Sequence, residues 1–360
     1  MCPNPTIRIV FLADTHLGFD YPLRPRVERR RRGQDFFDNF QRVLDHAVRS
    51  KADLLVHGGD LFFRKRVPKR IIDLAHGALF EFAAKGIPVI VVPGNHERSE
   101  LPVSLYLSHP NIHVFVEPKT EVFDIGGVRV AVSGFPFERY DVRERFTSVV
   151  AATRWEKTAA EIRLLCFHQV VEGARVGPSN YTFRRGSDVI RLDEIPDGLL
   201  AVLAGHIHRR QILRQKVRGT PNNHRHEASR KKTSGTPVIY PGSTERTSFA
   251  EKDEPKGFFD LSFRKSAGGE WILDDLEFVP LPTRPMVDLY LDGRIGPADL
   301  VPFFQSEIAR IDPNAIVRLR CTGQLGGDVK RKLSGRLLRG VFPDTMNYQL
   351  SRDLYRPQTG

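Results

Sequence analysis

The chain has 360 residues, of which 40% are hydrophobic and 27% charged, a balance typical of a globular protein with a sizeable core. Its 55 lysines and arginines exceed its 43 aspartates and glutamates, and the resulting charge of +12 favours polyanionic partners such as nucleic acid. Its three widely spaced cysteines indicate no disulfide framework, and no apolar run is long enough to span a bilayer, so we expect a cytoplasmic protein that does not bind a membrane.

In the first hundred residues, short apolar runs alternate with helical stretches. Strands are predicted at 7–13, 54–57 and 89–92. Helices are predicted at 34–50, where apolar residues share one side, and at 70–85, which Gly86 would end. This alternation is typical of a mostly parallel, layered sheet.

Strands dominate the next part of the chain. They are predicted at 114–116, 121–125, 128–133, 164–167, 200–203, 238–240 and 257–263, and one further helix is predicted at 155–162. The fold class that we expect is α/β, with two packed sheets flanked by helices.

Two segments interrupt the pattern. Residues 214–236 are polar and basic, which predicts a flexible surface insertion, and residues 281–285 read as a linker. Beyond the linker, strands at 286–291 and 315–321 and helices at 298–311 and 328–339 predict a small α+β module. We therefore expect a catalytic domain over 1–282, a capping domain over 283–350 and a tail over 351–360.

Polar motifs follow five of the predicted strands. They are Asp14-Thr15-His16, Gly58-Gly59-Asp60, Gly94-Asn95-His96-Glu97, His168 and Gly205-His206-Ile207-His208. Sites in open α/β sheets collect beyond the carboxyl ends of strands, so these side chains are expected to converge. Each motif alone has an ordinary structural explanation, but five in this order do not suggest coincidence.

The residue types in these motifs suit divalent cations. Aspartate offers an anionic oxygen, asparagine a neutral oxygen and histidine a nitrogen, a set that suits Mn²⁺, Fe²⁺ or Zn²⁺. Seven potential ligands exceed what one ion normally takes, whereas two ions could share the Asp60 carboxylate. Such a pair can clamp the attacking and leaving oxygens of a phosphoester and generate a hydroxide nucleophile.

The ordered motifs resemble the signature of the calcineurin-like metallophosphoesterase superfamily, whose fold is a two-sheet sandwich with flanking helices. The resemblance implies that one ion is held by Asp14, His16, Asp60 and His208, and the other by Asp60, Asn95, His168 and His206. It also implies that His96 contacts the phosphate and acts as a general acid on the leaving oxygen.

Longer stretches resemble the SbcD-type DNA nucleases, bacterial counterparts of the meiotic-recombination nuclease. These stretches are 11–18, 54–62, 167–169, 240–246 and 256–258, and Glu97 stands where that family usually has aspartate. The resemblance implies Mn²⁺-dependent 3′-to-5′ exonuclease action on duplex DNA and endonuclease action on single strands, in DNA repair and recombination.

Basic residues give separate support for a DNA substrate. One group follows the first metal motif, and a second lies on one face of a predicted strand of the capping domain. Phosphate contacts from such side chains dominate nucleic-acid affinity, although a solvated charge run remains the alternative. The candidate DNA-binding residues are Arg24, Arg26, Arg29, Arg30, Arg31, Arg32, Arg318 and Arg320.

Two other functions share some of these features. A phosphoesterase for a small molecule or phosphoprotein would use the same metals, and a non-catalytic scaffold could bind DNA ends. Members of the resembled family commonly form dimers and continue into helices that bind the coiled-coil ATPase SbcC. No such segment is expected before residue 360, so this partner is left open, as is a homodimer.

Overall fold

The structure is a computed structural model that describes residues 5–20, 32–97, 109–214, 235–351 and 354. The chain divides into two compact units. Unit 1 takes the described residues within 1–19, 36–246 and 254–281, and unit 2 takes those within 20–35, 247–253 and 282–360. The predicted insertion at 214–236 lies outside the described residues except at its ends.

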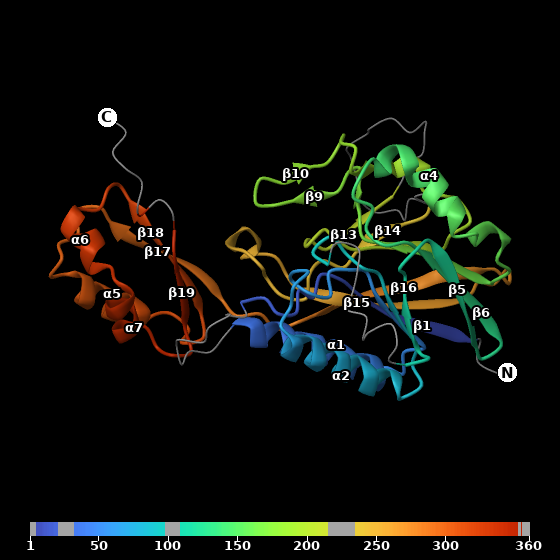
Figure 1. The fold of residues 1–360 in the computed structure, drawn as a ribbon, viewed down its shortest axis with the longest axis horizontal. Helices are drawn as coiled ribbons and strands as arrows, with labels where there is room; N and C mark the ends of the chain where they lie inside the picture. The colour runs from blue at the N-terminus through green and yellow to red at the C-terminus, as the bar shows by residue number, and fades with distance from the viewer. Residues whose placement is uncertain (1–4, 21–31, 98–108, 215–234, 352–353, 355–360) are drawn as a thin grey trace. The chain divides into compact units, whose positions relative to one another are not determined.

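The first sheet of unit 1 has the order β16-β15-β1-β2-β3-β4 (Figure 1). Strands β1 to β4 run parallel, whereas β15 pairs antiparallel with β1 and with β16. Their bounds are β1 Thr6–Leu12, β2 Leu54–His57, β3 Val89–Val91, β4 Ile112–Val114, β15 Gly257–Lys265 and β16 Trp271–Pro280.

The second sheet has the order β13-β14-β12-β7-β6-β5, with four central parallel strands. Alternate residues of both sheets, such as Phe11, Val56, Val132 and Leu203, form one buried cluster, so the sheets pack face to face. The bounds are β5 Lys119–Ile125, β6 Val128–Gly134, β7 Ile162–Phe167, β12 Ala201–Ala204, β13 Gln211–Leu213 and β14 Val238–Tyr240.

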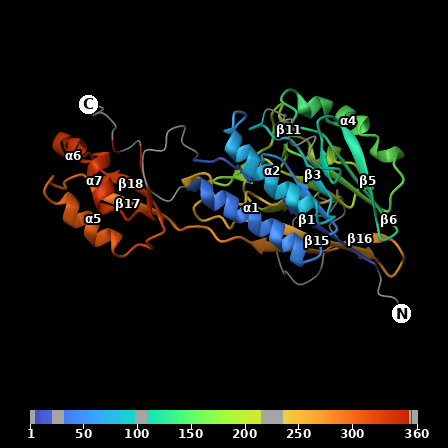
Figure 2. The same ribbon diagram turned by 60° about the horizontal axis from the view of Figure 1, so that its bottom comes forward.

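Helices cover the outer faces of the sheets. Figures 1 and 2 show α1 (Arg32–Arg49) and α2 (Lys69–Ala83) side by side over the first sheet, and α4 (Val142–Ala152) beside β5 and β6. Shorter elements complete unit 1 and a loop of unit 2: β8 Val170–Val171, β9 Arg175–Val176, β10 Tyr181–Thr182, β11 Val189–Ile190 and the 3₁₀ turns Trp155–Lys157, Leu192–Glu194 and Phe249–Glu251. The predicted two-sheet α/β sandwich is confirmed.

Unit 2 is built on a parallel sheet with the order β17-β18-β19. One face packs against helices through buried residues such as Leu289, Leu319 and Phe304. The elements are β17 Met286–Asp292, α5 Leu300–Ile308, β18 Ile316–Thr322, α6 Gly327–Lys332, α7 Gly335–Val341 and β19 Asn347–Leu350.

Two sequence-based expectations about local structure were wrong. The helix predicted at 155–162 is only a single 3₁₀ turn, because Ile162 already pairs with Val130 in the sheet. The single helix predicted at 328–339 is two, separated at Leu333, and the Ser334 hydroxyl caps the second by accepting the Leu337 N–H.

The predicted linker contains a buried charged residue, Arg284. Its guanidinium donates to Asp35 Oδ2 (3.2 Å), to Asn347 Oδ1 (2.5 Å) and to the carbonyls of Asn314 (2.5 Å) and Thr345 (2.7 Å), all within unit 2. Both Arg284 and Asp35 are buried, so removing one leaves the other as an unpaired buried charge.

We expect Arg284→Ala to destabilise unit 2 by about 3–5 kcal/mol. Hydrogen–deuterium exchange of the amides of β17 and β18 measures this change within the full chain. Arg294→Ala is the matched control, because its pair with Asp292 is exposed and should leave exchange nearly unchanged. Equal exchange in the two variants would contradict a structural role for the Arg284 network.

Candidate metal centre

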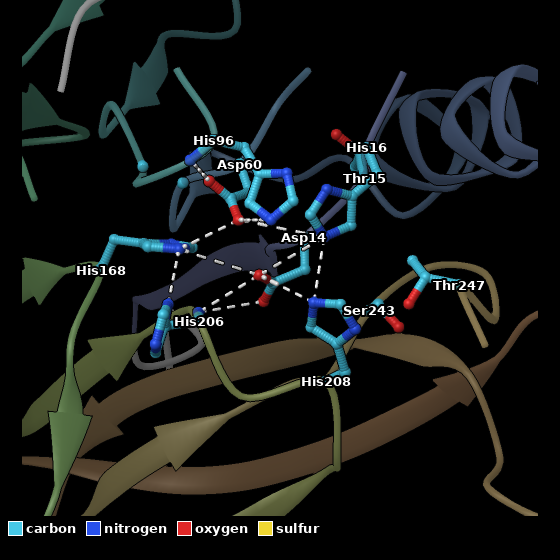
Figure 3. Close-up of polar contacts among 12 residues, drawn as sticks. Asp14, Thr15, His16, Asp60, His96, His168, His206, His208, Ser243 and Thr247 are labelled. Atoms are coloured by element: carbon cyan, nitrogen blue, oxygen red, sulfur yellow. Dashed lines mark hydrogen bonds and ion pairs between the residues drawn. The ribbon is translucent and has the colours of Figure 1, made fainter. Parts of the chain in front are cut away.

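The five predicted motifs meet at the carboxyl ends of the parallel strands of both sheets. Figure 3 shows the side chains of the two aspartates and of the histidines at 16, 96, 168, 206 and 208 pointing toward a common centre. Three groups have ligand atoms within 4.8 Å of one another: Asp14, His16 and His208; His16, Asp60 and His96; and Asp14, Asp60 and His168.

One side of the centre gathers two imidazoles around Asp14. The Nε2 atoms of His16 and His208 lie 3.0 Å apart and face each other. Asp14 Oδ1 lies 4.0 Å from His16 Nε2 and 3.7 Å from His208 Nε2, and Asp60 Oδ2 lies 3.9 Å from His16 Nε2. The ligand atoms of Asp14, His16 and His208 all lie within 4.8 Å of one another, and Asp60 joins them through His16.

The other side gathers a second set around Asn95. Its Oδ1 atom lies 3.0 Å from His168 Nε2 and 2.8 Å from His206 Nδ1. Asp60 Oδ2 is 3.3 Å from His168 Nε2, so the same carboxylate oxygen faces both sets. The seven residues that sequence analysis predicted as ligands are therefore brought together in two overlapping groups.

The backbone around the ligands is held in an uncommon conformation. Asp14, His16, Asp60 and His206 all have positive φ values, between 46° and 85°. Side chains with a Cβ atom rarely adopt this region, and such strain concentrates at functional sites. Hydrogen bonds offset the strain: Asp14 N–H donates to Gly59 O (2.9 Å) and His16 N–H to Asp60 O (3.0 Å).

Two glycines allow these loops to approach closely. A Cβ atom at Gly59, where φ is +104°, would lie 2.2 Å from His168 Nδ1. A Cβ atom at Gly94 would lie 2.1 Å from Asp60 Oδ1. Any side chain at either position would displace a candidate ligand, which explains the glycine in each motif.

Burial and mutual charge set the protonation of the centre. Burial, together with Asp60, raises the pKa of Asp14 to about 6, although His168 and His208 oppose this. Burial alone would lower the pKa of His168, but the negative charges of Asp60 and Asp14 raise it to about 9. The interaction with His168 in turn holds the pKa of Asp60 well below its usual range, although burial opposes this. A cation binding there would displace the imidazole proton.

The imidazoles of His16 and His206 are kept neutral. Burial lowers the pKa of His206 to about 3 and that of His16 well below its usual value, with nearby imidazoles adding to the effect. His168 donates from Nδ1 to Gly58 O (2.8 Å), which directs Nε2 toward the centre. Neutral imidazoles and buried carboxylates are the ligands that divalent cations require, so the residues present fit a pair of such ions.

His96 occupies the rim rather than the interior. Its Nδ1–H donates to Phe63 O (2.6 Å), and its Nε2 lies 3.8 Å from Asp60 Oδ2. The side chain is 34% exposed, whereas those of Asp14, His16 and His168 are fully buried. A half-exposed imidazole beside the centre can reach a bound phosphate.

His57 and Glu97, which sequence reasoning did not assign to the site, hold the ligand loops together. His57 Nε2 donates to Thr15 Oγ1 (2.9 Å), Thr15 donates to Leu61 O (3.0 Å), and His57 Nδ1 accepts the Gly59 N–H (3.2 Å). Burial lowers the pKa of His57 to about 3, so the ring stays neutral. A lone histidine ending an apolar buried strand was the available signal.

Glu97 connects the Asp60 loop to the loop of Asn95 and His96. Its carboxylate is buried and accepts N–H donors from Phe62 (2.5 Å) and Gly94 (2.7 Å). Burial and the Asp60 charge raise the pKa of Glu97 to about 8, opposed by these two donors. The motif marked Glu97 only as a departure from the usual aspartate, whereas the structure gives it a bracing role.

At pH 9, above the Glu97 pKa of about 8, we expect Glu97→Gln to destabilise the protein by about 1–3 kcal/mol, because the amide nitrogen would face a backbone N–H that loses its acceptor. Urea unfolding followed by circular dichroism measures the change. Glu138→Gln is the control, since Glu138 pairs with the half-exposed Arg145 at the surface. An unfolding midpoint equal to that of the wild type would contradict the bracing role.

The three candidate DNA-binding arginines that the structure describes all belong to unit 2. Arg318 pairs with Asp288 through two hydrogen bonds (2.5 and 2.9 Å) and stacks on Phe249, and Arg320 contacts Tyr290. Arg32 is the first residue of α1 and is buried. The remaining candidates, Arg24, Arg26, Arg29, Arg30 and Arg31, lie outside the described residues.

Comparison with known proteins identifies the class to which this fold and site belong. The family described as calcineurin-like phosphoesterase matches residues 7–210, more than half of the chain. The chain therefore belongs to the calcineurin-like phosphoesterase family, which confirms the predicted superfamily and a metal-dependent hydrolase of phosphate esters.

Among individual proteins, the chain is similar to archaeal proteins named DNA double-strand break repair protein Mre11. It is 26% identical to that of Methanopyrus kandleri, covering 76% of this chain and 57% of that protein. The Methanococcus maripaludis protein is also 26% identical, with 71% of this chain and 63% of that protein covered. The chain thus spans about three-fifths of the length of these relatives.

Among solved structures, similarity is found at lower sequence identity. A dimetal phosphatase from Danio rerio is 14% identical with a TM-score of 0.43, covering 77% of this chain and 96% of that chain. No helix of the described residues is both long and apolar enough to cross a membrane.

Proposed function

We propose that this protein is a two-metal DNA phosphodiesterase that acts in DNA repair and recombination. The observation that carries the proposal is the convergence of six other oxygen and nitrogen donors with the Asp60 carboxylate, with the half-exposed His96 beside them. The names of the archaeal relatives support DNA as the substrate. The more specific proposal is Mn²⁺-dependent 3′-to-5′ exonuclease action on duplex DNA and endonuclease action on single strands.

The ligand roles proposed here follow the two groups of the structure. Asp14, His16, Asp60 and His208 would hold one ion, and Asp60, Asn95, His168 and His206 the other. When bound, the two ions supply a hydroxide nucleophile and neutralise charge on the phosphate. His96, fixed through Nδ1 by Phe63 O, presents Nε2 to the leaving oxygen and gives it a proton.

The domain assignment belongs to the same proposal. Residues 1–282 would form the catalytic domain and 283–350 the capping domain, in which Arg318 and Arg320 are candidate DNA contacts. A homodimer and an SbcC-type coiled-coil ATPase are candidate partners that co-purification of the full chain would test.

Hydrolysis assays test the function directly. End-labelled duplex and single-stranded DNA would be incubated with Mn²⁺, Mg²⁺ or chelator, beside bis-p-nitrophenyl phosphate and a phosphopeptide. We expect DNA cleavage that requires Mn²⁺ and stops with chelator. Hydrolysis of the small ester or phosphopeptide without DNA cleavage would favour the alternative phosphoesterase, and DNA binding without hydrolysis would favour a scaffold.

A further inference from the structure

A short hairpin, formed by β9 and β10, lies outside both sheets (Figure 1). Each strand has two residues, and Tyr181 pairs with Val176 across them. A two-stranded hairpin of this size has little stability of its own in water. The bonds that hold it in place therefore indicate which part of the molecule it serves.

Those bonds come from the segment that carries two candidate ligands. Arg209 directly follows His208, and its guanidinium donates to Gly177 O (2.8 Å), Asn180 Oδ1 (2.6 Å) and Glu254 Oε1 (2.8 Å). Gln211 exchanges two bonds with the backbone of Arg175 (2.8 and 2.9 Å). The hairpin is thus fixed to the segment that positions His206 and His208.

The hairpin presents an aromatic ring to solvent with a second ring packed against it. Tyr181 is 58% exposed, and its ring meets Phe183 edge to face, with centroids 5.2 Å apart. Phe183 packs against the buried cluster of the second sheet, so the base of the hairpin is anchored. Arg184 and Arg185 follow directly and are exposed. A single exposed tyrosine is ordinary, but a held ring beside two arginines matches a base with its phosphates.

The loop from Phe137 to Tyr140 also combines aromatic and basic side chains. Phe137 lies with its ring 5.8 Å from that of His206, and the loop continues to Tyr140, which is 65% exposed and lies against the Arg139 guanidinium. The N–H of Arg143, at the start of α4, donates to Ser187 O (3.0 Å), just beyond the hairpin arginines. Aromatic and basic side chains therefore occur on two connected segments, one contacting His206 through Phe137 and the other bonded to Arg209 next to His208.

We propose that Tyr181 stacks on an unpaired base while Arg184 and Arg185 contact its phosphates, so that the hairpin favours single-stranded over duplex DNA. A base inside a duplex is already stacked and offers no free face, whereas every unpaired base does. This inference rests on the proposed nuclease function and assigns its substrate form to specific residues.

Substitution of Tyr181 tests the stacking role. We expect Tyr181→Leu, which keeps apolar bulk but loses the aromatic face, to lower kcat/KM for an oligothymidylate on the order of tenfold. Tyr181→Phe keeps the face and should retain wild-type cleavage. Neither variant should change hydrolysis of bis-p-nitrophenyl phosphate or of a blunt duplex, because neither substrate offers an unpaired base.

A double variant tests the phosphate contacts. Replacing Arg184 and Arg185 with serine should flatten the dependence of log K on log salt by up to about 1.4, at about 0.7 per phosphate contact on a single strand. Binding of a fluorescent oligothymidylate with chelator present gives this slope without cleavage.

The outcomes separate the inference from the function on which it rests. If the wild type cleaves DNA and Tyr181→Leu cleaves the oligothymidylate equally well, the stacking role is overturned and the nuclease function stands. If the wild type hydrolyses the small ester but no DNA, the nuclease function fails and the inference fails with it. An unchanged salt slope in the double variant removes the arginines from the proposed site.

Discussion

Replacing Asp60 with asparagine is expected to cost the protein bound metal and nearly all turnover. The carboxylate is buried, and its Oδ2 atom faces His16, His96 and His168 at 3.9, 3.8 and 3.3 Å. Asparagine keeps the shape but removes the negative charge that both proposed ions share. We expect the loss of activity to exceed the roughly 10–100-fold typical of losing a residue that only supports a ligand.

Metal content and rate should be measured on the same samples. After dialysis against Mn²⁺, elemental analysis should give clearly less than the wild-type stoichiometry, and hydrolysis of bis-p-nitrophenyl phosphate should fall in parallel. Asp260→Asn is the control, because Asp260 is also buried and paired with a histidine, His46 at 2.8 Å, but lies on β15 away from the ligands. Full metal content in Asp60→Asn would refute the shared-ligand arrangement.

Replacing His96 with alanine is expected to separate metal binding from catalysis. Its position on the rim predicts that the variant keeps both metals but loses about 10²–10⁴-fold in DNA cleavage, the usual contribution of a general acid. The deficit should be smaller with bis-p-nitrophenyl phosphate, since p-nitrophenolate leaves without needing a proton. Rates on both substrates, with metal analysis, check this expectation.

The geometry also contains the competing assignment, in which His96 is a ligand together with His16 and Asp60. Loss of metal from His96→Ala would establish that assignment, and an equal deficit on both substrates would exclude proton donation. His113→Ala is the control, because His113 is a partly exposed histidine paired with Glu121 on the adjacent surface, and it should behave as the wild type.

The sequence was sufficient to predict that the candidate ligands converge, because each follows a strand in a short motif, and parallel strands of one sheet end at one edge. The layered fold was predictable for the same reason, from runs such as Leu54–His57 that are buried on both faces. Most of the candidate site could therefore be predicted from short motifs in the sequence.

Features that depend on distant partners were not predictable. Residues 158–161 have a composition that suits a helix, but pairing of Ile162 with Val130 draws the segment into the sheet. The bracing by Glu97 depends on two N–H groups, one of them 35 residues away, that no spacing rule identifies. The hairpin at Tyr181 was missed because strands of two residues leave no periodic signal.

The left-handed backbone at four candidate ligands has a consequence for laboratory evolution. Each such residue costs some of the free energy that folding releases, and glycine would adopt the same conformation at little cost. Selection for thermal stability alone would favour glycine at those positions and would yield proteins that are more stable but have no activity. Thermal screening of this enzyme should therefore be coupled to selection for turnover.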